Sequence, residues 1–93
     1  MDQDDLSSST LALTELQNGQ GGVIERVRAS DAHVTVDTVA RLGELGFLPG
    51  EPVRLLRRGP GGREPIAVQV GDTLFALRWL EARCIDVRTE EAT

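Results

Sequence analysis

Residues 66–77 read IAVQVGDTLFAL, and this stretch predicts a β-hairpin. Its first half alternates branched apolar side chains with smaller or polar ones, which is the period of a strand with one buried face. The Gly71–Asp72 pair suits a tight hairpin turn, because Gly adopts a positive φ without steric cost. Pairing across this turn places Val68 opposite Phe75. We therefore expect a domain built from antiparallel strands.

Further short elements are predicted on both sides of this hairpin. Residues 11–16 read as a short strand and a turn of helix, and residues 23–27 as a strand. Residues 52–58 alternate imperfectly, which suggests a strand with a bulge. A helical turn at 79–83 precedes a last strand at 84–87. Since short strands avoid exposed edges best by closing on themselves, we expect a mainly β fold, a small barrel of five to six strands.

One short α-helix is predicted to be inserted between the strands. Asp37 or Thr38 is expected to cap its start by accepting a hydrogen bond from a free backbone N–H. Gly46 stands where the chain leaves the helix in a left-handed conformation. Phe47 then falls where it can pack back on Leu42, the apolar contact that accompanies this helix ending.

The charge pattern sets the expected limits of the domain. The chain has 93 residues with ten Arg, no Lys and fifteen acidic residues, for a net charge of −5. Residues 1–9 are acidic and Ser-rich and are predicted to be a disordered lead-in. Residues 10–88 form the predicted domain, and residues 89–93 a flexible tail. The central part, residues 19–87, carries nine Arg and nine acidic residues and is neutral.

Composition also excludes several classes of function. A neutral domain gains little from counterion release, so we expect no nucleic-acid partner. No apolar run approaches the length of a spanning helix, so we expect no direct membrane insertion and a cytoplasmic location. The single Cys84 cannot form an intrachain disulfide and is interpreted as a small buried apolar residue. With one His and one Cys and no catalytic arrangement around them, the chain is not expected to be an enzyme.

A metal site is one hypothesis for the loop before the helix. Asp31, His33 and Asp37 cluster there, and an imidazole flanked by carboxylates suits a divalent transition metal such as Fe(II) or Zn(II). One chain offers too few nitrogen and sulfur donors for a closed tetrahedral site. Such a site would therefore recruit carboxylates or ligands from a second chain, as in a homodimer. The alternative is that His33 is an ordinary exposed loop residue.

Arginines surround one predicted hairpin, which gives a second hypothesis. Arg54, Arg57, Arg58 and Arg63 are placed to form a rim for an anion or a carboxylate. The alternative is a solvated face balanced by neighbouring glutamates.

Two sequence signatures resemble the FeoA family, the ferrous iron transport protein A family. The more specific one is RLGELGFLPG at residues 41–50, preceded by leucines at 13 and 16 and a glycine at 19. The later one is PIAVQVGD at residues 65–72, followed by ALR at 76–78 and an Ile-x-Val pair at 85–87. Together they span about residues 10–88, nearly the whole predicted domain.

The resemblance implies a fold and a role. It implies a small SH3-like barrel with an inserted helix, acting as a cytoplasmic accessory protein of FeoB, the membrane Fe(II) transporter with a GTPase domain. The same fold is found as the C-terminal domain of metal-dependent repressors of the DtxR type, but no DNA-reading helix pair precedes it here. The family pattern singles out no catalytic residue and no required cofactor.

These observations favour a binding module. Leu45 and Leu48 at the helix exit, with Arg54 and Arg57 at the rim, are the candidate surface for docking on FeoB and for recruitment to the inner membrane. The alternative function is a metal-responsive module that binds Fe(II) or Zn(II) at His33, Asp31 and Asp37, between two chains. A third hypothesis is that an Arg reaches toward the transferring phosphate of the transporter's GTPase.

Overall fold

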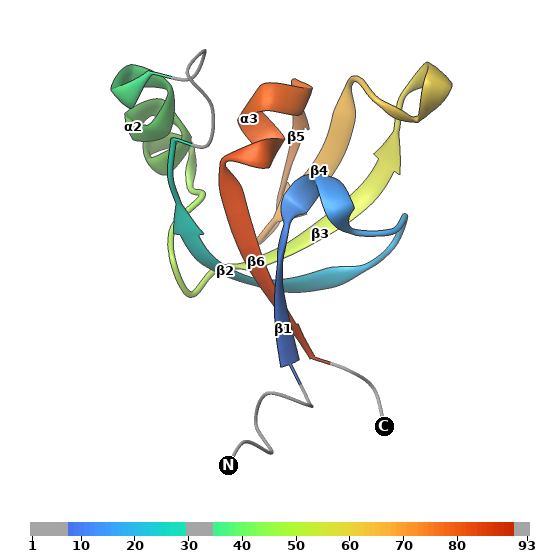
Figure 1. Cartoon of the computed structure of the whole chain (residues 1–93), viewed down its shortest axis with the longest axis horizontal. Helices are drawn as coiled ribbons and strands as arrows, with labels where there is room; N and C mark the ends of the chain where they lie inside the picture. The colour runs from blue at the N-terminus through green and yellow to red at the C-terminus, as the bar shows by residue number, and fades with distance from the viewer. Residues whose placement is uncertain (1–7, 30–34, 91–93) are drawn as a thin grey trace.

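The computed structural model describes residues 8–29 and 35–90, which form one curled antiparallel sheet with helical segments at its ends (Figure 1). The order of the strands in the sheet is β1-β6-β2-β3-β4-β5. The strands are β1 (Ser8–Ala12), β2 (Gly21–Val27), β3 (Pro52–Arg58), β4 (Ile66–Val70), β5 (Thr73–Leu77) and β6 (Ile85–Glu90).

The helical segments are short. The α-helices are α2 (Val36–Leu45) and α3 (Trp79–Arg83), and the 3-10 turns are η1 (Leu13–Glu15) and η2 (Pro60–Gly62). Among the described residues, no helix has the length and apolar character that crossing a bilayer requires.

The hairpin at the centre of the sequence prediction is confirmed. β4 and β5 pair antiparallel with Val68 opposite Phe75, and the turn lies at Gly71, whose φ is 59°. The predicted bulge is also present, since the register between β3 and β4 shifts between Leu55 and Arg57. Alternation and turn chemistry therefore predicted the register of this half of the sheet.

The expected closure of the barrel is wrong. β1 and β5 are the two ends of the sheet order, and in the part of the chain that the structure describes they do not pair. β1 leads directly into η1, and β5 leads through Arg78 into α3; these two helical turns contact each other. Packing between helical turns therefore replaces a strand ladder at this point, and the result is a partly open, SH3-like barrel.

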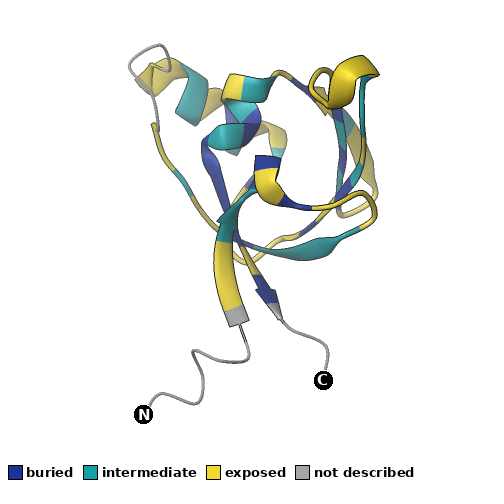
Figure 2. Ribbon diagram, turned by 45° about the vertical axis from the view of Figure 1, so that its right-hand side comes forward, coloured by how far each residue is buried: buried dark blue, intermediate teal, exposed yellow. Residues whose placement is uncertain are grey.

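The core lies inside the curl of the sheet. In Figure 2 the buried segments lie along the strands, and the tips of the helices and turns are exposed. Phe47 is the largest fully buried side chain, and its ring lies 4.9 Å from that of Phe75 between centroids. Cys84 is buried, as predicted. The buried apolar residues are Leu13, Leu16, Ile24, Leu42, Phe47, Val53, Leu55, Ile66, Val68, Val70, Leu77, Ala82, Cys84, Ile85 and Val87.

The start of α2 differs from the prediction, and its end agrees. Thr35 is the N-cap, and its side chain accepts a hydrogen bond from the backbone N–H of Thr38; Asp37 lies inside the first turn. Thr35 takes this role because its extended backbone turns its hydroxyl back over the first turn. At the other end Gly46 is left-handed with a φ of 116°. The N–H of Phe47 donates to the carbonyl of Leu42, which closes the helix.

The terminal strands reach beyond the predicted limits of 10–88. β1 begins at Ser8, and β6 continues to Glu90 through Thr89, which is 5% exposed. The hydroxyls of Ser9 and Thr89 lie 3.2 Å apart. Pairing between these two strands orders residues that look unstructured when each terminus is read alone. Residues 1–7 and 91–93 lie outside the described residues.

Candidate functional site

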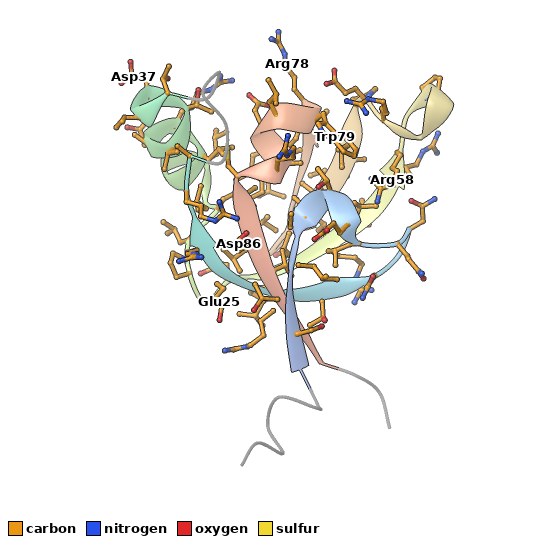
Figure 3. All side chains as sticks on the ribbon, in the orientation of Figure 1. Glu25, Asp37, Arg58, Arg78, Trp79 and Asp86 are labelled. Carbon is orange, nitrogen blue, oxygen red and sulfur yellow. The ribbon has the colours of Figure 1, made fainter. Side chains whose placement is uncertain are left out.

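The predicted metal site is only partly described. Asp37 lies exposed in the first turn of α2, and Figure 3 shows it at the outer end of that helix. Asp31 and His33 lie outside the described residues. Within residues 8–29 and 35–90, no three His, Cys, Asp or Glu side chains come together as a metal site. Of the three predicted ligands, only Asp37 lies among the described residues, and its carboxylate oxygen suits a divalent cation.

The two leucines of the predicted docking surface are exposed at the C-terminal end of α2. Leu45 is 41% exposed and Leu48 is 48% exposed. Phe47, which lies between them in the sequence, and Leu42, which precedes them, are buried. The N–H of Leu48 donates to the carbonyl of Gly46, so the turn holds this side chain outside the core. Each of these leucines therefore keeps part of its apolar surface in contact with solvent.

The arginines of the same prediction lie on β3. Arg54 is exposed and donates through Nη1 to the carbonyl of Gly19. Arg57 is exposed near the end of β3, five residues after Pro52, a path of about 16 Å along a strand. β3 runs away from the loop that follows α2 (Figure 1). Leu45, Leu48, Arg54 and Arg57 therefore do not form one compact patch. Leu45 and Leu48 both lie at the C-terminal end of α2, and the two arginines lie along β3.

The remaining arginines of the predicted rim hold the structure together. Nη2 of Arg58 donates to the carbonyls of Thr14 and Leu16 and so ties β3 to η1. The Arg63 guanidinium lies 4.3 Å from the centre of the Trp79 ring, a cation–π contact. Arg58 and Arg63 thus each make a contact within the fold, and their role as an anion rim stays a prediction.

A pocket that the sequence did not reveal lies between β1, η1, the β2–β6 pair and α3. Its volume is about 640 Å³. Figure 3 shows Asp86 on β6 below α3, the helix that carries Trp79. The lining residues combine charged, hydroxyl and apolar side chains: Thr10, Leu11, Ala12, Thr14, Glu15, Arg26, Arg28, Trp79, Arg83 and Asp86.

Two arginines converge on one buried carboxylate in this pocket. Asp86 is 4% exposed. Its Oδ2 accepts from Nε of Arg26 at 2.9 Å and from Nε of Arg28 at 2.8 Å. Its Oδ1 accepts from Nη2 of Arg28 at 3.3 Å. Arg28 therefore binds the carboxylate in a bidentate manner, and Arg26 binds it through one hydrogen bond.

The electrostatics of this trio follow from its geometry. Burial raises the pKa of Asp86, but the hydrogen bonds and charges of Arg28 and Arg26 outweigh that effect and hold it below its usual value. The hydrogen bond and charge of Asp86 in turn raise the pKa of Arg28. Asp86 and Arg28 are therefore both charged near neutral pH.

The sequence indicates which way Asp86 faces but not which residues it meets. Ile85 and Val87 face the core, so Asp86 between them faces the other side, where a carboxylate would ordinarily be solvated. The register places Arg26 of the neighbouring strand directly opposite Asp86. Arg26 and Asp86 are 60 positions apart in the sequence, so only the pairing of β2 with β6 brings them together.

Residues 11–89 match the FeoA domain, which is nearly all of the described fold. The chain belongs to the FeoA family. No curated protein matches the chain in sequence. The matched range contains α2 and all of the core residues, so the family assignment covers the whole folded unit.

Solved structures of FeoA proteins share this fold. FeoA of Stenotrophomonas maltophilia, described as a prokaryotic SH3 domain protein and complexed with zinc, is 41% identical with a TM-score of 0.73, covering 88% of this chain and 99% of that one. FeoA of Chlorobium tepidum is 30% identical with a TM-score of 0.67, covering 88% of this chain and 71% of that one. A manganese-dependent transcriptional repressor, 18% identical with a TM-score of 0.72, shares the fold alone; the match covers 89% of this chain and 43% of the repressor.

Proposed function

We propose that this FeoA-family protein is a cytoplasmic accessory factor of Fe(II) uptake that docks on the FeoB membrane transporter. The observation that carries the proposal is the FeoA match over residues 11–89. Its family is associated with ferrous iron transport, and an accessory protein of a transporter works through contact with it. Recruitment to the inner membrane would then come from FeoB.

The docking surface that we propose is centred on Leu45 and Leu48. Both side chains are large, apolar and exposed, and they stand at the end of one short helix. Apolar anchors at the centre of an interface contribute most of the binding free energy, and polar groups at the rim set orientation. Arg54, nearer the start of β3, is assigned to the rim, and Arg57 lies further along that strand, outside it.

Co-purification with FeoB tests this surface. We expect tagged wild-type protein to retain FeoB from solubilised membranes, and the double change Leu45→Asp with Leu48→Asp to lose it. Leu74→Asp is the matched control, because Leu74 is 65% exposed on β5 and the substitution is the same. Equal retention of FeoB by the double variant would reject the α2 exit as the docking surface.

A metal-responsive role is the second candidate, and one observation favours it. The Stenotrophomonas maltophilia relative was solved in complex with zinc. In this chain we propose Asp31, His33 and Asp37 as ligands for Zn(II) or Fe(II), with a second copy completing the coordination in a homodimer.

Calorimetry with Zn(II) tests the metal site. We expect His33→Ala to weaken Zn(II) binding at least tenfold, because His33 is the single histidine of the sequence and its imidazole is the nitrogen ligand of the proposed site. Unchanged affinity in that variant would reject the site. Sedimentation with and without Zn(II) measures whether binding produces a dimer.

A further inference from the structure

We propose that two copies of this chain pair through the outer edges of their β5 strands and form a symmetric dimer. β5 (Thr73–Leu77) is a terminal strand of the sheet, and among the described residues β4 is the one strand that pairs with it. The dimer needs no metal and includes neither Leu45 nor Leu48. Its failure would therefore leave FeoB docking and the metal site standing, and their failure would leave the dimer standing.

The outer edge of β5 carries backbone groups that have no partner in the described part of the chain. Val70 and Thr73 flank a two-residue turn, so the N–H and C=O groups of Thr73 point toward β4. This direction alternates along an antiparallel strand, so Leu74 and Ala76 point theirs away from β4. Within residues 8–29 and 35–90, no hydrogen bond engages these outward groups. A second strand would satisfy them.

β5 lacks the devices that ordinarily keep an edge strand from pairing, which are a charge, a proline or a bulge. Residues 73–77 read TLFAL, with no charged residue and no proline. Their register with β4 runs from end to end without a shift. Leu74 is 65% exposed, and Ala76, two residues further on the same face, is also exposed. The edge is therefore regular, apolar and open to another strand.

The charges that flank β5 select a second copy of this chain as the partner. Asp72 precedes the strand and Arg78 follows it; both are exposed, and neither side chain forms an ion pair within the described residues. In an antiparallel pair with Phe75 opposite its own copy, Asp72 of each chain lies opposite Arg78 of the other. The same register sets Leu74 opposite Ala76. Backbone hydrogen bonds, apolar contacts and both ion pairs thus agree on one register.

These ion pairs form only between chains. Asp72 and Arg78 are six positions apart, a path of about 20 Å along an extended strand, so they do not meet within one copy. The two-fold arrangement uses the same edge on both copies and therefore closes at two chains. Pairing of β5 with a different edge of the next copy would instead give open chains of more than two copies.

Sedimentation equilibrium in EDTA tests the dimer, at about 10 µM to about 1 mM protein because the contact of one strand edge is small. We expect a concentration-dependent equilibrium between monomer and dimer. Asp72→Arg and Arg78→Asp should each weaken dimerisation about tenfold, since each places like charges opposite each other twice. The double variant restores both ion pairs and should return to within about twofold of the wild type. Arg88→Asp, at an exposed position on β6, is the matched control and should dimerise like the wild type.

Amide hydrogen exchange locates the contact on β5. Exchange at Leu74 and Ala76 should slow as the protein concentration rises, and exchange at Phe75, whose N–H points toward β4, should change little. A monomer at every concentration, assemblies larger than two chains, or exchange at Leu74 and Ala76 that does not depend on concentration would overturn the proposal. So would a double variant no better than the single ones, or an equal loss in Arg88→Asp. The wild-type measurements decide even where a variant does not fold.

Discussion

Replacing Asp86 by Asn tests whether the shared carboxylate stabilises the fold. The change keeps the size of the side chain and removes its charge. Asp86 accepts three hydrogen bonds, from Nε of Arg26 and from Nε and Nη2 of Arg28. We therefore expect Asp86→Asn to be less stable than the wild type at neutral pH.

The magnitude follows from how exposed the partners are. A hydrogen bond to a charged group contributes about 1.5–3 kcal/mol. The Arg26 and Arg28 side chains are 66% and 45% exposed. Water can therefore hydrogen-bond to most of the guanidinium N–H groups that lose their partner in Asp86→Asn. An asparagine oxygen also keeps one acceptor. The expected net loss is about 2 kcal/mol, and for a domain of this size that lowers Tm by about 8–16 °C.

The pH dependence has a defined sign. The pKa of Asp86 is lowered in the folded protein, so its contribution to stability is present above the unfolded pKa of about 3.9 and is lost as pH falls through the folded pKa. The gap in unfolding free energy between the wild type and Asp86→Asn should thus be constant from neutral pH to about pH 5 and narrow below about pH 4.

Urea unfolding followed by circular dichroism at several pH values measures this gap. Asp72→Asn, at an exposed turn position, is the matched control for the loss of one negative charge. We expect that control to lie within about 0.5 kcal/mol of the wild type. A gap for Asp86→Asn as small as the control's, or one that stays constant down to pH 3, would show that the charged Asp86 does not stabilise the fold.

Three further predictions concern the core, the helix cap and a close strand contact. Phe47→Ala should lower the free energy of unfolding by about 3–5 kcal/mol, and Phe75→Ala should lower it less because its ring is only partly buried. Chemical unfolding compares the two variants, and equal losses would contradict the placement of the core. Thr35→Ala should cost about 0.5–2 kcal/mol by removing the cap of α2, and an unchanged unfolding midpoint would show that Thr35 does not cap it. Gly22→Ala should lower the free energy of unfolding by about 1–3 kcal/mol, because a Cβ at this position would lie 2.6 Å from the carbonyl oxygen of Arg88. A melting temperature equal to that of the wild type would argue against this close approach of β2 and β6.

Local patterns predicted the elements whose causes are local. The β4–β5 register follows from apolar alternation and a turn at Gly71, all within twelve residues. The end of α2 follows from Gly46, since few other residues adopt its left-handed backbone. The RLGELGFLPG segment at 41–50 contains this helix end and also carries the more specific part of the family resemblance.

Features that depend on contacts between distant segments were not visible in the sequence. The open side of the barrel comes from η1 meeting α3, and the extra residues of β1 and β6 are ordered only because the two strands pair. The Asp86 trio has the same cause, since strand pairing alone brings β2 to β6. Of the predicted docking residues, Leu45 and Leu48 are exposed at the end of α2, and Arg57 lies further along β3. Their role in docking stays a prediction.

The proposed function depends on docking of the α2 exit on FeoB. Photo-crosslinking in cells tests it most directly, with a photoreactive amino acid at position 48 in one strain and at position 74 in another, both of which carry exposed leucines. We expect a covalent product with FeoB from position 48 and none from position 74. A FeoB product from position 74 alone, or none from position 48, would contradict it.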